Sequence, residues 1–161
     1  MKILSIDPGY ERLGIAIIEK IDKEKETLIF SECFKTDKKL PHPDRLSLIQ
    51  IRIIEIIKKL KPEMLAIETL FFSNNQKTAL LVSEARGTII STSRTAGLEV
   101  FEYTPNSIKL AVTGYGKSDK NAIIKMIPQL ILISPEKLKS IKHDDEYDAI
   151  AVGLTHFAIH R

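Results

Sequence analysis

Four acidic residues from three distant segments stand where the sequence predicts the end of a strand or the start of a helix. Asp7 closes a short apolar run before a Pro-Gly turn, and Glu68 closes a second apolar run. Asp145 and Asp148 open an apolar stretch three residues apart, which places them on one face of a helix. Carboxylates gathered in this way raise each other's pKa unless a cation lies among them. Because such oxygen ligands suit Mg²⁺ or Mn²⁺, the sequence predicts a divalent metal site.

The elements that must position these carboxylates follow from the pattern of apolar residues. Short apolar runs between turn residues predict five strands, at residues 2–7, 14–18, 27–34, 64–68 and 98–103. Helical spacing predicts helices at residues 43–60, 73–95, 118–128 and 145–159, and a short one from 104–105 onward. Ser118 is the expected cap of its helix. We expect one α/β domain over residues 1–161, with a mixed five-stranded sheet flanked by helices.

The order of these elements predicts where the carboxylates meet. Three antiparallel strands come first and β-α-β units follow, so the fourth strand comes after a crossover helix and lies parallel to the first. Asp7 and Glu68 then end side by side at one edge of the sheet, where ligands bind in open α/β sheets. The last helix is expected to bring Asp145 and Asp148 to the same edge.

Composition is typical of a soluble globular protein. The 161 residues are 43% hydrophobic and 28% charged, and no apolar run approaches the roughly 20 residues of a membrane helix. The chain runs from Met1 directly into a strand, so we expect no signal peptide. The one cysteine, Cys33, cannot form an internal disulfide and is expected to pack in the core. We therefore expect a cytoplasmic protein that does not bind membranes.

The net charge of +3 is too small to indicate nucleic-acid binding, but the lysines are clustered. The clusters are Lys35, Lys38 and Lys39; Lys58, Lys59 and Lys61; Lys109, Lys117, Lys120 and Lys125; and Lys137, Lys139 and Lys142. Such groups would form either a phosphate-binding surface around an acidic centre or an ordinary solvated surface. The glycines before Lys117 do not form a Walker A motif, because Ala111 stands where the motif needs a glycine.

Two aromatic residues, Phe71 and Phe72, follow the strand that ends at Glu68. Both rings cannot face the core at a tight turn, so we expect one to be exposed, where an aromatic ring would stack on an unpaired base. Core packing is the alternative for either ring. The four histidines show no metal-ligand spacing; they are His42, His143, His156 and His160.

Several blocks of the sequence belong together: Ile6-Asp7-Pro8-Gly9 with Gly14, Ala66-Ile67-Glu68-Thr69-Leu70-Phe71, Ala85-Arg86-Gly87, Val100-Phe101-Glu102-Tyr103 and Asp145-Glu146-Tyr147-Asp148-Ala149-Ile150-Ala151. These blocks resemble the RuvC family of Holliday-junction resolvases. They occur in the family's order and cover nearly the whole chain. The resemblance implies an RNase H-like fold and a homodimeric, Mg²⁺-dependent endonuclease that nicks two opposed strands of a four-way DNA junction. It also implies RuvA and RuvB, the branch-migration proteins, as partners.

The resemblance also implies roles for individual residues. The family's catalytic, metal-binding positions fall on the four carboxylates, which would hold two Mg²⁺ ions per active site, with Mn²⁺ able to substitute. The DNA-probing aromatic falls on Phe71, and the basic residues near the active site fall on Lys109 and Lys120. At the third carboxylate the Asp-x-x-Asp-Ala spacing favours Asp145, whereas His143 and Asp144 are alternative ligands.

Three other functions fit parts of the same pattern. A YqgF-type RNase H-like nuclease acting on RNA would share the segment around Asp7, but Phe71 and the paired acids of the last helix favour RuvC. An actin-like nucleotide-binding module would need a second domain of similar size. A non-enzymatic junction-binding protein would have no need for the intact carboxylates.

A stripe of small residues on the predicted helix 73–95 is relevant to dimer formation. Ala79, Ser83 and Gly87 recur at four-residue spacing, which allows close helix packing. The stripe would lie either against a second copy of the chain or against the sheet.

Overall fold

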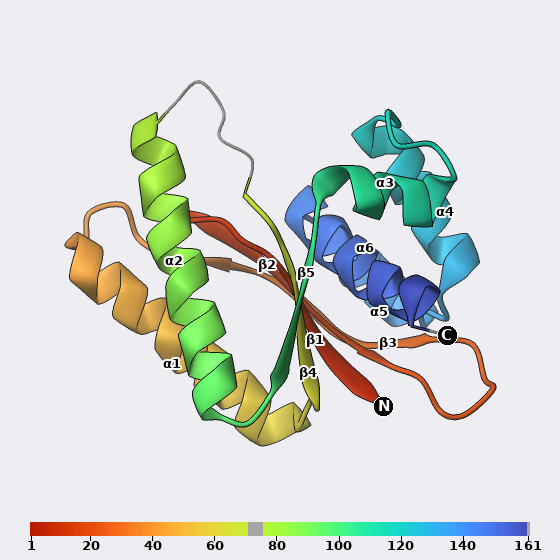
Figure 1. Cartoon of the computed structure of the whole chain (residues 1–161), viewed down its shortest axis with the longest axis horizontal. Helices are drawn as coiled ribbons and strands as arrows, with labels where there is room; N and C mark the ends of the chain where they lie inside the picture. The colour runs from red at the N-terminus through yellow and green to blue at the C-terminus, as the bar shows by residue number, and fades with distance from the viewer. Residues whose placement is uncertain (71–75, 161) are drawn as a thin grey trace.

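The computed structural model describes residues 1–70 and 76–160, and has a mixed β-sheet between two layers of helices (Figure 1). The strands are β1 (Lys2–Asp7), β2 (Arg12–Glu19), β3 (Thr27–Lys35), β4 (Met64–Glu68) and β5 (Glu99–Tyr103). The helices are α1 (His42–Leu60), α2 (Gln76–Thr95), α3 (Pro105–Thr113), α4 (Lys120–Leu130), α5 (Pro135–Ser140) and α6 (Asp144–Ile159). Within the described ranges, no helix is long and apolar enough to cross a membrane.

The sheet has the strand order β3-β2-β1-β4-β5. The first three strands pair antiparallel, as adjacent segments joined by short turns do. After α1, the chain returns as β4, which pairs parallel with β1, and β5 pairs parallel with β4. The predicted mixed five-stranded sheet with flanking helices is therefore confirmed.

Each face of the sheet carries its own apolar core. Leu4 and Ile6 of β1 belong to the core under α1 and α2, whereas Ile3 belongs to the core under α6 and its neighbours α3 and α4. This difference follows from the strand period of two, which sends successive side chains to opposite faces. In β4, Ala66 lies on the α6 side and Leu65 on the other. Odd residues of β1 and even residues of β4 thus face α6.

The ends of several helices differ from the sequence prediction, and one helix was not predicted. Asp119, not Ser118, caps α4: its Oδ1 accepts a hydrogen bond from the Ala122 amide at 2.8 Å, while the Ser118 hydroxyl donates to the Tyr115 carbonyl. The helix continues past its internal proline to Leu130. The short helix α5 was not predicted, because it has no buried residue and therefore no apolar period. Helix α6 begins one residue before the predicted start.

Candidate active site

Asp7 and Glu68 end adjacent parallel strands and point to the same face of the sheet. The register pairs Ile6 of β1 with Ile67 of β4, so the two carboxylates follow as the next pair at the carboxyl ends. Side chains an even number of residues apart in a strand point to the same face of the sheet. Asp7 therefore points to the same face as Ile3, and Glu68 to the same face as Ala66, and both Ile3 and Ala66 pack on the α6 side. Strand order and side-chain alternation alone therefore bring these two acids together beneath α6.

Helix α6 brings Asp145 and Asp148 over the same edge. The Asp145 and Asp148 side chains are 15% and 23% exposed, whereas the neighbouring Asp144 side chain is 60% exposed. Asp145, rather than Asp144, is thus turned toward the sheet, where its Oδ2 lies 3.7 Å from the Cys33 thiol sulfur. The predicted carboxylates from β1, β4 and α6 are therefore brought to one place. We call Asp7, Glu68, Asp145 and Asp148 the acidic cluster.

Burial and mutual repulsion raise the pKa values of carboxylates in the acidic cluster. Burial raises the pKa of Asp7 to about 8, and repulsion from Asp148, Glu68 and Asp145 adds to this effect. The pKa of Glu68 is raised to about 7, first by burial and then by Asp148. Burial also raises the pKa of Asp148, and Lys120 opposes that rise. Such a cluster is a favourable place for a cation, which would offset the repulsion and keep the carboxylates ionised.

Both predicted lysines lie beside the acidic cluster. Lys120, the first residue of α4, has its Nζ 2.7 Å from Asp148 Oδ2 and 3.7 Å from Asp144 Oδ2. Lys109 of α3 lines the same hollow, of about 210 Å³, at the edge of the sheet. The lining residues are Glu68, Pro105, Ile108, Lys109, Lys120, Ile123, Asp148 and Ala151. This hollow therefore combines anionic side chains with two cationic ones.

The donor set fits a hard divalent cation, although the side chains are not already arranged around one. Among residues 1–70 and 76–160, no group of three or more His, Cys, Asp or Glu side chains is positioned to hold a metal ion as it stands. Lys120 instead provides the counter-charge of Asp148. Four carboxylates with repulsion to relieve are nevertheless oxygen donors of the kind that Mg²⁺ and Mn²⁺ bind. Which side chains act as ligands stays a prediction.

Three residues near Asp145 were not predicted to belong to the site. Arg12 Nη2 lies 3.4 Å from Asp145 Oδ2, and the Cys33 thiol contacts the same oxygen instead of lying in the core. The third is Gly14, which pairs with both Asp7 and Cys33 in the sheet. Strand alternation from Asp7 across β2 and β3 is the one sequence signal that could have identified Gly14 and Cys33.

The remaining predictions concern two phenylalanines and the histidines. Phe71 and Phe72 fall outside the described residues, so Phe71 stays a prediction. Two of the histidines contact tyrosines: Tyr103 Oη lies 2.8 Å from Nδ1 of the buried His156, and His42 Nδ1 lies 2.7 Å from Tyr10 Oη.

Two of the three small residues of the stripe on α2 do not face the sheet. Ser83 and Gly87 are exposed, and the sheet side of α2 carries the buried Ala85 and Ile89 instead. Leu80, next to the stripe, is 63% exposed. Of the two alternatives for the stripe, packing against the sheet is therefore wrong for Ser83 and Gly87.

Comparisons with known proteins agree with this geometry. Residues 3–156 match the family described as crossover junction endodeoxyribonuclease RuvC. A relative of that name from Halothermothrix orenii is 37% identical over 156 residues, which cover 97% of this chain and 92% of the relative. Another, from Thermosipho melanesiensis, is 40% identical over 153 residues, which cover 95% of this chain and 94% of the relative.

Solved structures show the same likeness in three dimensions. The structure of Thermus thermophilus RuvC in complex with a Holliday junction substrate has a TM-score of 0.90 and 28% identity, covering all of this chain and 95% of the other. The yeast mitochondrial Holliday junction resolvase Ydc2 has a TM-score of 0.71 at 15% identity, which is a likeness of fold alone.

Proposed function

The chain belongs to the RuvC family of crossover junction endodeoxyribonucleases, and we propose that it resolves four-way DNA junctions by nicking two opposed strands symmetrically. The observation that carries this proposal is the meeting of Asp7, Glu68, Asp145 and Asp148 at one sheet edge, beside two lysines. Junction resolution would serve homologous recombination and DNA repair. Neither an RNA-directed YqgF-type activity nor a non-enzymatic binding role is favoured by any feature of the site.

The acidic cluster is the proposed site of metal-assisted phosphodiester hydrolysis. Its carboxylates would hold two Mg²⁺ ions, or Mn²⁺ in their place. When bound, such ions supply an activated water molecule and stabilise the leaving 3′-oxygen, giving 5′-phosphate and 3′-hydroxyl ends. The chain's own contribution is the fixed backbone beneath the carboxylates, since Asp7 and Glu68 end paired strands and Asp148 lies on a packed helix.

Lys109 and Lys120 are proposed to bind the DNA backbone next to the scissile bond. Both line the hollow that contains Glu68 and Asp148, so a phosphate drawn to these lysines would lie close to the carboxylates. Lys120 also holds Asp148 by an ion pair, so its side chain would serve both the protein and the substrate. The two cations offset part of the repulsion between the acidic cluster and DNA. Phe71 is proposed to stack on a base opened at the crossover.

A homodimer is proposed because symmetric cutting of opposed strands requires two active sites. The exposed Ser83 and Gly87 allow close helix approach, and the exposed Leu80 offers apolar area for burial. A two-fold dimer through this face of α2 would place the same residues in contact from both copies. RuvA and RuvB are the proposed partners that bring the junction to the enzyme, and the cytoplasm is the proposed location.

A junction-cleavage assay tests the proposal directly. The purified chain is incubated with a labelled four-way junction, a linear duplex of the same sequence and a structured RNA, each with Mg²⁺ or with EDTA. We expect paired nicks in the junction only, and only with Mg²⁺. Cleavage of the RNA in preference to the junction would support the YqgF-type alternative, and binding without cleavage would support the non-enzymatic one.

A further inference from the structure

Helix α6 contains a buried carboxylate that the proposed chemistry does not use. Glu146 is 6% exposed and lies between Asp145 and Asp148 in the sequence. Its Oε2 accepts a hydrogen bond of 2.7 Å from the Ser31 hydroxyl of β3, and its Oε1 accepts one of 3.3 Å from the Lys142 amide. A glutamate is rarely this buried unless it is paired, and buried polar groups are normally hydrogen-bonded. Glu146 therefore joins the start of α6 to the edge strand of the sheet.

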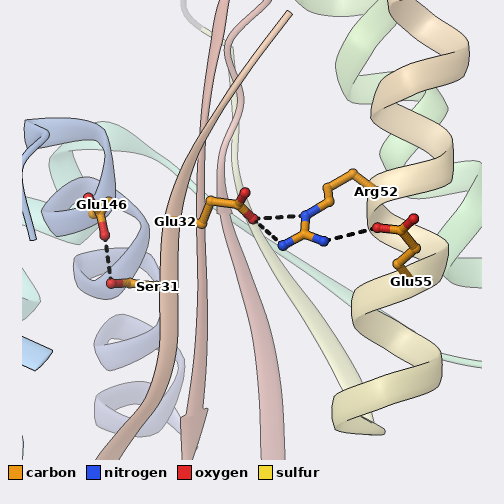
Figure 2. Close-up of polar contacts among 5 residues, drawn as sticks. All are labelled: Ser31, Glu32, Arg52, Glu55 and Glu146. Carbon is orange, nitrogen blue, oxygen red and sulfur yellow. Dashed lines mark hydrogen bonds and ion pairs between the residues drawn. The ribbon is translucent and has the colours of Figure 1, made fainter. Parts of the chain in front are cut away.

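Strand alternation determines that Ser31, and not its neighbour, makes this contact. Ser31 pairs with Ala16, which belongs to the core under α6, whereas Glu32 pairs with Ile15, which belongs to the core under α1. Figure 2 shows the result: the Ser31–Glu146 hydrogen bond lies on one side of β3. On the other side, Glu32 accepts hydrogen bonds from Arg52, which also bonds Glu55. Two consecutive residues of β3 thus anchor different helices.

The start of α6 depends on such outside contacts. Among the described residues, His143 at the N-cap position makes no side-chain cap hydrogen bond. Three consecutive acids, Asp144, Asp145 and Glu146, then occupy the first turn. Acids are favourable to the helix dipole there, but they repel each other and the rest of the acidic cluster. The ion pairs of this turn are partly exposed and hold it only weakly: Arg12, the partner of Asp145, is 53% exposed, and Asp144, which pairs with Lys120, is 60% exposed.

We propose that the Ser31–Glu146 hydrogen bond is a latch that fixes the first turn of α6, so that Asp145 and Asp148 lie with Asp7 and Glu68 at one edge of the sheet. Glu146 is then a positioning residue, which acts through its neighbours and touches neither metal nor DNA. The inference rests on the proposed function of the acidic cluster. Hydrogen bonds of this kind orient the residues that bind a metal. Removing such a hydrogen bond typically lowers metal affinity or activity by about 10–100-fold.

The test compares variants of Ser31 with a matched variant of the next residue. Ser31→Ala removes the latch, Ser31→Thr keeps the hydroxyl, and Glu32→Gln weakens the ion pair with Arg52 on the opposite face of the same strand. Two quantities are measured for each full-length variant: the rate of junction cleavage over a Mg²⁺ titration, and the rise in Tm that Mn²⁺ causes relative to EDTA. Because a ligand that binds the folded state raises Tm, the second quantity reports metal binding without catalysis.

We expect Ser31→Ala to need about tenfold more Mg²⁺ for half-maximal rate and to lose most of the Mn²⁺-induced rise in Tm. Ser31→Thr should keep the wild-type Mg²⁺ requirement and the wild-type Mn²⁺-induced rise in Tm. Glu32→Gln should also keep both, even if its Tm in EDTA falls as far below that of wild type as the Tm of Ser31→Ala does. Glu146→Gln, which keeps an acceptor oxygen for Ser31, should lie between wild type and Ser31→Ala. Wild-type behaviour of Ser31→Ala in both measurements would overturn the latch.

These outcomes separate the latch from the proposed function. A wild-type chain that does not cut junctions would refute the proposed function, whereas the Mn²⁺-induced change in Tm would still test the latch. A Ser31→Ala variant and a Glu32→Gln variant that lose metal response equally would also overturn the latch, since a general loss of stability would then explain both.

Discussion

The backbone carbonyl oxygen of Asp145 lies directly over Gly14, 2.0 Å from the position that a Cβ atom on this glycine would occupy. Gly14 pairs with Asp7 across the sheet, and a Cβ on Gly14 would also lie 3.1 Å from the Asp7 Cβ. The first turn of α6 can therefore approach β1 and β2 only because residue 14 has no side chain. This close approach brings Asp145 from the last helix to Asp7 from the first strand.

Gly14→Ala should displace the first turn of α6 and impair the acidic cluster. Because backbone atoms cannot move aside as a flexible side chain can, we expect a loss of about 1–3 kcal/mol in the free energy of unfolding. We expect the cleavage rate to fall by about tenfold or more, because displacing a catalytic group lowers the rate of the chemical step. Denaturant unfolding and single-turnover cleavage measure the two effects.

Wild type is the reference for both measurements. If Gly14→Ala were as stable and as active as wild type, the close contact with Asp145 would not be needed for the site.

Asp7→Asn should abolish junction cleavage and leave junction binding intact or slightly stronger. The substitution removes a proposed ligand charge with almost no change in volume, so the fold should survive. Binding should not weaken, because one negative charge near the DNA phosphates is lost. A gel-shift assay in Ca²⁺ measures binding, and a cleavage assay in Mg²⁺ measures activity. Cutting at near the wild-type rate would remove Asp7 from the catalytic assignment.

The same carboxylate should make stability depend on pH when no divalent cation is present. The pKa of Asp7 is raised to about 8 in the folded protein from 3.8, so between these values the folded state holds a proton that the unfolded state has lost. The free energy of unfolding should therefore fall as pH rises from about 4 to about 8.

Asp7→Asn should remove the share of this fall that Asp7 contributes, leave the shares of Glu68 and Asp148, and make the variant more stable than wild type at pH 8 in EDTA. A difference of one pKa unit corresponds to about 1.4 kcal/mol, so we expect a gain of at least about 2 kcal/mol. Urea unfolding at pH 5 and pH 8 in EDTA measures the effect. Parallel pH dependence of the two proteins would show that Asp7 ionises normally in the folded state.

The sequence was sufficient to predict that the fourth strand lies parallel to the first, and the edge at which the carboxylates meet. Asp7 and Glu68 could be placed because each ends a local apolar run, and the crossover rule then makes their strands parallel neighbours. The contacts of Ser31 and Gly14 with α6 could not be predicted. They join residues more than 100 positions apart, and they depend on the distance at which α6 packs across β2 and β3.

Lys109→Ala should weaken junction binding and reduce its salt dependence. If Lys109 contacts one phosphate, the slope of log K against log salt should become shallower by about one. Lys120→Ala should have a similar effect on the slope, but it also removes the ion pair with Asp148. Binding isotherms in Ca²⁺ at several salt concentrations measure both slopes. An unchanged slope would indicate that the lysine in question is solvated and not bound to phosphate.

Leu80→Asp should separate the dimer into monomers. The Leu80 side chain is 63% exposed in a single chain, so an aspartate there should fold normally, but burying it in a dimer interface without a partner would be costly. Leu132→Asp is the matched control, because Leu132 is 51% exposed and pairs with Thr27 of β3 in an isolated bridge instead of lying on α2. Light scattering should give twice the chain mass of 18.2 kDa for wild type and control, and 18.2 kDa for Leu80→Asp.

The loss of the dimer should change the products as well as the mass. On a supercoiled plasmid with an extruded cruciform, paired cuts by a dimer give linear DNA in one binding event, whereas a monomer cuts one strand and gives nicked circles. We therefore expect Leu80→Asp to shift the first product from linear to nicked DNA, and Leu132→Asp to behave as wild type. A Leu80→Asp variant that stays dimeric and still linearises the plasmid would place the interface elsewhere on the chain.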